Sequence, residues 1–341
     1  MTEISEPALE RRPERVVAID YIKALAIVAV AFTHAGLPYW DASITSYDRI
    51  LCGFWVQFHV PSFLLLSGLL YYSPRRIGLR PIGARLSRVI VPYLIASALV
   101  QIAGFSNAKD FGDVVFQFAT ASSLGIYYYI FLLVIFIPSL WILSRMSPRM
   151  NSAALVCVLG GTFGLEMYFQ MVARGAEPAG VADLFWLMRS PFNYSYTMFL
   201  GGWIAAAYLP QLRRLLDTRR LLIGVLCVLG IVVWTAAHVW RELFVSGGVL
   251  RYIYTLSVVV GLVLLLRNGR QVGIIRFLSD TTLGLYLYHH IFQTMAAPHV
   301  ADWHPLLRIF TLAFGGLIGA SAVCWISRRL LGPKAKLLFG A

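Results

Sequence analysis

Long apolar runs of roughly 20 residues recur along the whole chain, and they constrain its fold more than any other feature. A helical run of that length matches the hydrocarbon thickness of a bilayer. Only 13% of the residues are charged, whereas soluble domains carry about 25%. The sequence therefore excludes an ordinary soluble enzyme, a disordered tail, a fibre and a disulfide-rich secreted domain. It predicts an all-α integral membrane protein.

We expect a bundle of about ten transmembrane helices with short connections. The predicted spans are 16–37, 50–72, 88–105, 124–143, 152–172, 192–209, 221–240, 249–266, 274–296 and 306–326. Segment 106–123 is expected to be amphipathic or re-entrant. The chain then divides into an N-terminal tail (1–15), a membrane domain (16–326) and a basic tail (327–341). The first apolar run is too long for a signal-peptide core, so we expect it to be retained as a span.

The distribution of basic residues predicts the orientation of the bundle. Of the 29 Lys and Arg residues, 21 fall on the side of the N-terminal tail when the ten spans alternate, 6 fall on the opposite side, and Lys23 and Arg251 lie within spans. Cytoplasmic loops carry the excess of basic residues in membrane proteins. We therefore expect both termini to be cytoplasmic, and we interpret the net charge of +13 as topology rather than nucleic-acid binding.

The sequence predicts neither a disulfide framework nor a metal site. All four cysteines, Cys52, Cys157, Cys227 and Cys324, fall within apolar runs and are expected to be thiols. No paired histidines at helical spacing, cysteine cluster or carboxylate pair indicates a metal. A Walker-type phosphate loop and a GxGxxG turn are also missing, which argues against a device driven by ATP or NAD.

The first span carries three ionisable residues, Asp20, Lys23 and His34. At about 100° per residue all three share one helix face, and Lys23 lies about 16 Å nearer the cytoplasm than His34. Ionisable residues inside a membrane are costly and mark functional sites. A buried Asp20–Lys23 pair that only fixes helix packing is the structural alternative. Glu166, a lone acid in the fifth span, is expected to pair with an arginine.

Further histidines occur in the second and ninth spans. His59 lies next to Pro61, which removes a backbone donor and loosens the local helix. His289 and His290 are adjacent and differ by about 100° around the helix, so we expect only one of them to face the interior. Helical rise places His34, His59 and His289 together in the outer half of the membrane.

Arginines gather at the cytoplasmic end of the third span. Arg85 and Arg88 are three residues apart and share a helix face. Topology alone accounts for such a cluster, but two guanidinium groups at that spacing also suit the binding of phosphate.

Four motifs in this order resemble the membrane-bound acyltransferase-3 family, which includes bacterial O-acetyltransferases of surface polysaccharides and lipid-linked sugars. The motifs are IDYIKALA at 19–26 leading to His34, FHVPSF at 58–63 followed by SG at 67–68, Arg85 and Arg88 leading to PY at 92–93, and LGLYLYH at 283–289. Together with the ten-helix layout, the resemblance spans nearly the whole chain. Where the family usually has an arginine before the first-helix histidine, this chain has Lys23.

The resemblance implies transfer of an acyl group, usually acetyl from acetyl-CoA, to a hydroxyl of a sugar, polysaccharide or lipid-linked glycan. It implies that His34 is the general base, because a neutral imidazole suits proton removal near pH 7. Lys23 and Asp20 would order the channel below it. Acetyl-CoA would be a co-substrate rather than a permanently bound cofactor, and succinyl remains open as the acyl group.

The same resemblance implies roles for the other motif residues. Arg85 and Arg88 would hold the CoA phosphates at the cytoplasmic side. His59, His289 and Tyr286 would contact the acceptor. The location implied is the bacterial cytoplasmic (inner) membrane, and the oligomeric state stays open.

A transporter or flippase for a glycan or lipid-linked precursor is the competing class, since polar residues in a channel suit transport equally. We find no internal repeat and no pair of broken helices in the sequence, which favours the transferase. A non-catalytic membrane scaffold is the third interpretation.

Overall fold

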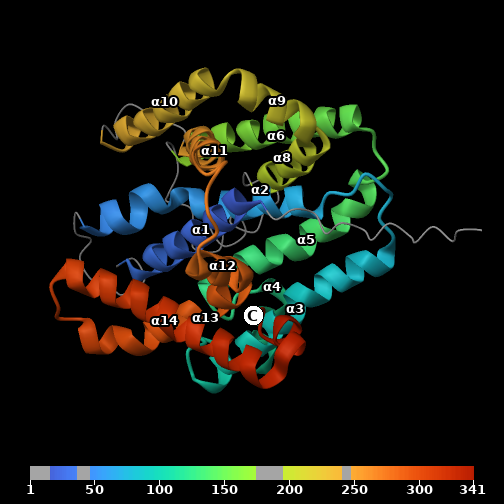
Figure 1. Ribbon diagram of the computed structural model, residues 1–341. Helices are drawn as coiled ribbons and strands as arrows, with labels where there is room; N and C mark the ends of the chain where they lie inside the picture. Colours follow the sequence, from blue (N-terminus) through green and yellow to red (C-terminus); the bar gives the residue numbers. More distant parts are fainter. Residues whose placement is uncertain (1–15, 37–46, 174–194, 240–246) are drawn as a thin grey trace, which may run out of the picture.

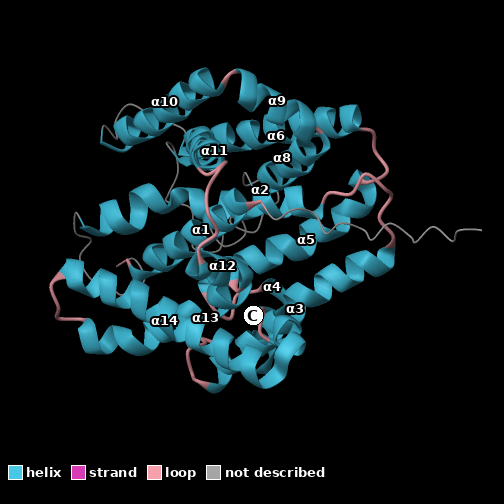
Figure 2. Cartoon of the chain, in the orientation of Figure 1, coloured by secondary structure: helices cyan, strands magenta, loops and turns pink. Residues whose placement is uncertain are grey.

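The computed structural model describes residues 16–36, 47–173, 195–239 and 247–341. Within these ranges all the regular secondary structure is helical, the helices are joined by loops, and no strand occurs (Figure 2). The predicted fold class is therefore confirmed for the described part of the chain.

The first half of the chain contributes one central helix and the helices that follow it. These elements are α1 (Val17–Ala35), the π-helix η2 (Asp48–Phe54), the 3-10 helix η3 (Trp55–Phe58), α2 (His59–Tyr71), α3 (Leu79–Ile102), α4 (Phe111–Thr120), the 3-10 turn η4 (Gly125–Tyr127), α5 (Tyr128–Leu143) and α6 (Pro148–Ala173). The second half contains α8 (Ser195–Ala207), α9 (Leu209–Thr218), α10 (Arg220–Val239), α11 (Gly247–Leu265), α12 (Gly273–Asp280), α13 (Thr282–Val300), α14 (Pro305–Leu331), η5 (Gly332–Lys334) and α15 (Ala335–Leu338).

Helix α1 runs through the middle of the bundle. It packs against α2 on one side and against α12, α13 and α14 on the other (Figure 1). Its sequence contains no glycine or proline and is rich in alanine, the best helix former, whose small side chain lets neighbouring helices approach closely. Most of its residues are buried. The polar residues of α1 are therefore directed at other helices.

The packing of α2 on α8 depends on two glycines. A Cβ atom at Gly68 would overlap the backbone carbonyl of Phe199, and one at Gly202 would overlap that of Leu65. The two backbones thus touch directly, because neither glycine carries a side chain at the contact.

Six helical segments among the described residues are long and apolar enough to cross a membrane. They are Val17–Ala35, Ile50–Tyr71, Leu79–Ile102, Phe111–Leu143, Arg220–Ala237 and Pro305–Leu338, and a shorter apolar helix covers Leu250–Leu265. The chain is a multi-pass membrane protein on this basis. The number of about ten spans and the cytoplasmic placement of the termini stay predictions.

The structure adds detail to three of the predicted segments. The single helix expected over 274–296 is two helices, α12 and α13, separated at Thr281. Segment 106–123 contains α4, whose N-terminus is capped by the Asp110 side chain, which accepts a hydrogen bond from the Asp113 amide (2.8 Å). The predicted tail 327–341 begins inside α14 and continues as η5 and α15. Residues 1–15 and the Glu166 side chain lie outside the described residues.

Candidate active site

Three buried histidines from two helices meet at the centre of the bundle. His34 comes from α1, and His289 and His290 come from α13. The ring centroid of His34 lies 5.5 Å from that of His289 and 5.6 Å from that of His290. Both α13 histidines therefore face the interior, and the prediction that only one of them would do so is wrong. The ring of His34 lies close to both rings, because α1 packs against α13.

Backbone contacts orient the ring of His289. Its Nδ1 lies 3.0 Å from the carbonyl oxygen of Leu285 and 2.9 Å from that of Tyr286. A carbonyl can only accept, so in the neutral ring Nδ1 carries the proton and Nε2 carries the lone pair. Nε2 is buried and has no hydrogen-bond partner in the described part of the chain. His289 thus presents an acceptor atom inside the bundle.

A glutamine ties His290 to α1. The His290 Nδ1 lies 3.0 Å from Oε1 of Gln293, whose Nε2 donates to the carbonyl oxygen of Ala31 (2.8 Å). Gln293 is fully buried. Because Ala31 precedes His34 by one helical turn, this bridge fixes the α13 histidines relative to His34.

His59 stands at the start of α2, where the preceding 3-10 helix ends. Its Nδ1–H donates to the carbonyl oxygen of Val56, and the side chain is buried. It is close enough to interact electrostatically with His34 and His289. The structure therefore brings together the histidines of all three motifs.

A cavity of about 330 Å³ lies at the end of the bundle where α1, α3 and α13 begin. Four cationic side chains line it: Lys23 from α1, Arg85 and Arg88 from α3, and Lys336 from α15. The guanidinium of Arg85 lies over the ring of Tyr71, 5.1 Å from its centroid. Its Nη1 is buried without an acceptor among the described residues. The cavity is thus suited to an anion.

The inner wall of the cavity is aromatic and apolar, and it includes Phe63, Tyr129 and Tyr286. The Tyr286 hydroxyl donates to the carbonyl oxygen of Ile126, so its ring is held in place. The Tyr286 and His289 ring centroids are 6.3 Å apart. Tyr286 therefore stands between the cationic cavity and the histidines.

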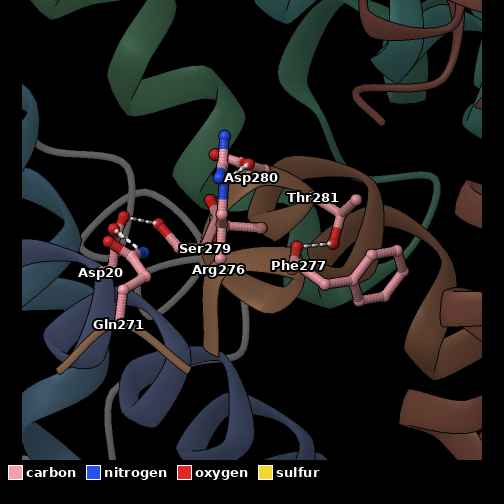
Figure 3. Close-up of polar contacts among 8 residues, drawn as sticks. Asp20, Gln271, Arg276, Phe277, Ser279, Asp280 and Thr281 are labelled. Carbon is pink, nitrogen blue, oxygen red and sulfur yellow. Dashed lines mark hydrogen bonds and ion pairs between the residues drawn. The ribbon is translucent and has the colours of Figure 1, made fainter. Parts of the chain in front are cut away.

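Asp20 lies outside both groups and joins α1 to α12. Its carboxylate accepts hydrogen bonds from Nε2 of Gln271 and from Oγ of Ser279, both at 2.6 Å (Figure 3). Asp280 and Arg276 form a longer ion pair nearby, with 3.8 Å between Arg276 Nε and Asp280 Oδ2. Asp20 is buried, and these contacts join α1 to α12 and to the loop before it.

Sequence reasoning missed Gln293 beside the histidines, Lys336 at the cavity and Gln271, which bonds to Asp20. Gln293 is a neutral amide in an apolar helix and Gln271 is a neutral amide in the loop before α12, and neither gives a signal of function. Lys336 is one basic residue in a segment whose positive charge topology already explains. No group of three or more His, Cys, Asp or Glu side chains among the residues described is placed to hold a metal ion. The four cysteines are thiols, and Cys52, Cys227 and Cys324 are buried.

Comparison with known proteins gives one match. A family model described as an acyltransferase domain, that of the acyltransferase-3 family, matches residues 16–328. The match covers every histidine and arginine motif considered above. No curated protein and no solved structure matches the chain.

Proposed function

The chain belongs to the acyltransferase-3 family and is a membrane acyltransferase, and from this premise we propose that it moves an acetyl group from acetyl-CoA to a hydroxyl of a sugar, polysaccharide or lipid-linked glycan. The observation that carries the proposal is the order of groups along α1 and α13. Both helices place cavity residues at their beginnings and histidines further along.

Acyl-CoA suits this order because its two ends differ chemically. The nucleotide end carries phosphates, which match the cations Lys23, Arg85 and Arg88 in the cavity wall. The thioester end is joined through an uncharged arm, which matches the wall formed by Phe63 and Tyr286. Along α1, the 11 residues from Lys23 to His34 span about 16 Å. If the phosphates bind near Lys23, the uncharged arm of CoA has this distance to cover to bring the thioester to the histidines.

In the proposed reaction His34 acts as general base. Its imidazole takes the proton of the acceptor hydroxyl as that oxygen attacks the thioester carbonyl. The C–S bond then breaks, the new ester keeps the acyl group, and the thiolate of CoA recovers a proton from the imidazolium. The Nε2 lone pair of His289 would accept a hydrogen bond from the acceptor or from His34, and His59 would contact the acceptor.

The proposed setting is the bacterial cytoplasmic membrane, with both termini and the cationic cavity on the cytoplasmic side. The excess of Lys and Arg on the side of the termini supports this orientation. Acetyl-CoA would then enter from the cytoplasm, and the histidines in the outer half would meet an acceptor at or near the external face, as in the modification of a surface polysaccharide.

His34→Gln tests the proposal. In membranes supplied with acetyl-labelled acetyl-CoA and native glycan, we expect release of free CoA and transfer of label to fall at least about 100-fold, the usual contribution of a general base. His299→Gln is the matched control, because His299 lies on α13 and is exposed. Label in the glycan or lipid fraction would identify the acceptor class.

Two results would contradict the proposal. Full transfer by His34→Gln would remove this histidine from the chemistry while keeping the enzyme. A folded wild-type protein that neither releases CoA nor transfers label would overturn acetyl-CoA as donor and would favour another acyl donor, such as succinyl-CoA, or a transporter.

A further inference from the structure

The segment after α14 folds back onto the bundle. Residues of η5 and α15 pack against α14, α15 also packs against α3, and the segment finishes beside α3 and α13 (Figure 1). Ala335 and Ala341 are only 1% and 3% exposed. These residues are therefore part of the packed structure.

Two glycines seat this segment against α13. The amide of Gly284 donates to the carbonyl oxygen of Gly340 (3.2 Å). A Cβ at Gly284 would lie 2.6 Å from Cys324 Sγ and 2.8 Å from the carbonyl oxygen of Phe339, so only glycine fits. Gly340 has φ +68°, a left-handed conformation that favours glycine, and a Cβ there would lie 3.0 Å from the Gly284 nitrogen.

This packing brings Lys336 to the wall of the cationic cavity, which Arg85 and Arg88 of α3 also line. Lys336 and Gly340 both line the cavity. Lys334, two residues earlier, is equally basic and exposed, but it is not among the described residues that line the cavity. Position in the fold, and not charge alone, therefore distinguishes Lys336.

Topology does not explain why cations from three elements converge on one cavity. Among the described residues the cavity wall also includes an acidic residue, Asp280. Arg85 and Arg88 from α3 and Lys336 from α15 add positive charge to the same wall, and this charge attracts a polyanion. The nucleotide of acyl-CoA is such a polyanion, with a diphosphate and a separate ribose phosphate.

We infer that segment 332–341 forms one wall of the acyl-CoA site and that Lys336 binds a phosphate of the CoA nucleotide. This inference rests on the proposed function. Lys336 acts on donor affinity and takes no part in proton transfer, because the histidines lie further along α1 and α13. Its flexible stem and exposed position suit a point contact at the entrance of the cavity.

The test compares two donors, acetyl-CoA and S-acetylpantetheine, which has the same thioester and arm but no phosphate. For Lys336→Gln we expect the KM for acetyl-CoA to rise about tenfold with kcat unchanged, as for loss of one charge-assisted contact. The KM for S-acetylpantetheine should not change. Lys336→Arg should restore the KM for acetyl-CoA, and Lys334→Gln should leave both constants at the wild-type values.

Gly340→Ala provides a second route to the same effect without removing a charge. A Cβ in the left-handed conformation would dislodge the segment, so the KM for acetyl-CoA should again rise while the KM for S-acetylpantetheine stays constant. Size-exclusion chromatography in detergent checks that the variant is folded.

The outcomes separate the inference from the function beneath it. If the wild type is active and Lys336→Gln has the wild-type KM for acetyl-CoA, the inference is overturned and the enzyme stands. If Lys336→Gln raises the KM for both donors equally, the substitution changes the shape of the site whether or not the donor has phosphates, and the proposed phosphate contact is overturned. If the folded wild type uses neither donor, the proposed function fails and the inference fails with it.

Discussion

At the scale of single residues, hydrogen bonds to neutral groups determine how the histidines are presented. His59 and His289 each direct Nδ1 to a backbone carbonyl, and His290 directs Nδ1 to Gln293. In each neutral ring this leaves Nε2 as the acceptor. The three rings therefore share one tautomer, with the proton on Nδ1 and the lone pair on Nε2. This tautomer is the one expected where a hydroxyl donates to the rings, because Nε2 then accepts.

The bridge through Gln293 gives a prediction at this scale. Gln293→Leu keeps the volume but removes the contacts to His290 and to the Ala31 carbonyl, so it leaves a buried Nδ1–H without a partner, at a cost of about 1–3 kcal/mol. We expect kcat to fall about tenfold, as for a misplaced catalytic group, with the KM for acetyl-CoA unchanged. Steady-state kinetics on purified protein measure both constants.

Thr294→Val is the control for this variant. Thr294 is the next residue on α13, and its hydroxyl only bonds to the His290 carbonyl of its own helix (2.9 Å). It should keep wild-type kinetics. A folded Gln293→Leu protein with the wild-type kcat would show that the bridge does not position the catalytic groups.

At the scale of elements, the sequence predicts where apolar helices occur but not how they are interrupted. The run from 274 to 296 has the composition of one span, yet the polar stretch Ser279–Asp280–Thr281–Thr282 interrupts it. Serine, aspartate and threonine side chains compete for backbone groups and so weaken a helix. At this interruption the Ser279 hydroxyl donates to the carboxylate of Asp20, 259 residues away, and that long-range contact has no signature in local sequence.

Asp20→Ala tests whether this carboxylate joins helices or takes part in chemistry. Removal leaves the buried Ser279 hydroxyl without its acceptor and also removes the bond from the exposed Gln271 side chain, and we expect a loss of about 1–3 kcal/mol of stability. The thermal unfolding temperature in detergent should fall clearly. Arg276→Ala is the control: it breaks the neighbouring exposed ion pair and should cost less than about 1 kcal/mol.

An opposite pattern would change the role of Asp20. If Asp20→Ala unfolds at the wild-type temperature and yet abolishes transfer, the carboxylate belongs to the catalytic channel, as the family resemblance implies, and the contacts to α12 are incidental.

Contacts between distant residues cannot be seen in local sequence, and this explains which residues of the candidate site were predictable. His34, His59 and His289 were predictable, because titratable groups inside apolar helices are costly and stand out. Gln293 and Lys336 were not. An amide in a helix and a lysine after the last span are ordinary residues until the fold places one between two helices and the other beside a cavity.

At the scale of the whole molecule, the two groups of functional residues lie at different depths. The cationic cavity is at the end where α1 and α13 begin, and the histidines lie further along both helices. In the proposed reaction this arrangement separates the donor from the acceptor across the membrane. The proposed direction of transfer therefore depends on which end faces the cytoplasm.

Cysteine labelling decides this orientation. The 27 residues of α14 span about 40 Å, enough to cross a bilayer, so we expect Asp302, in the turn before α14, and Lys334, after it, on opposite sides. In a Cys157→Ser background, which removes the exposed native thiol, we expect a membrane-impermeant maleimide to label Asp302→Cys in intact cells. Lys334→Cys should react only after permeabilisation. The reverse pattern would place the cationic cavity outside, where cytoplasmic acyl-CoA cannot reach it, and would overturn the proposed path of the acyl group even if the transfer itself were confirmed.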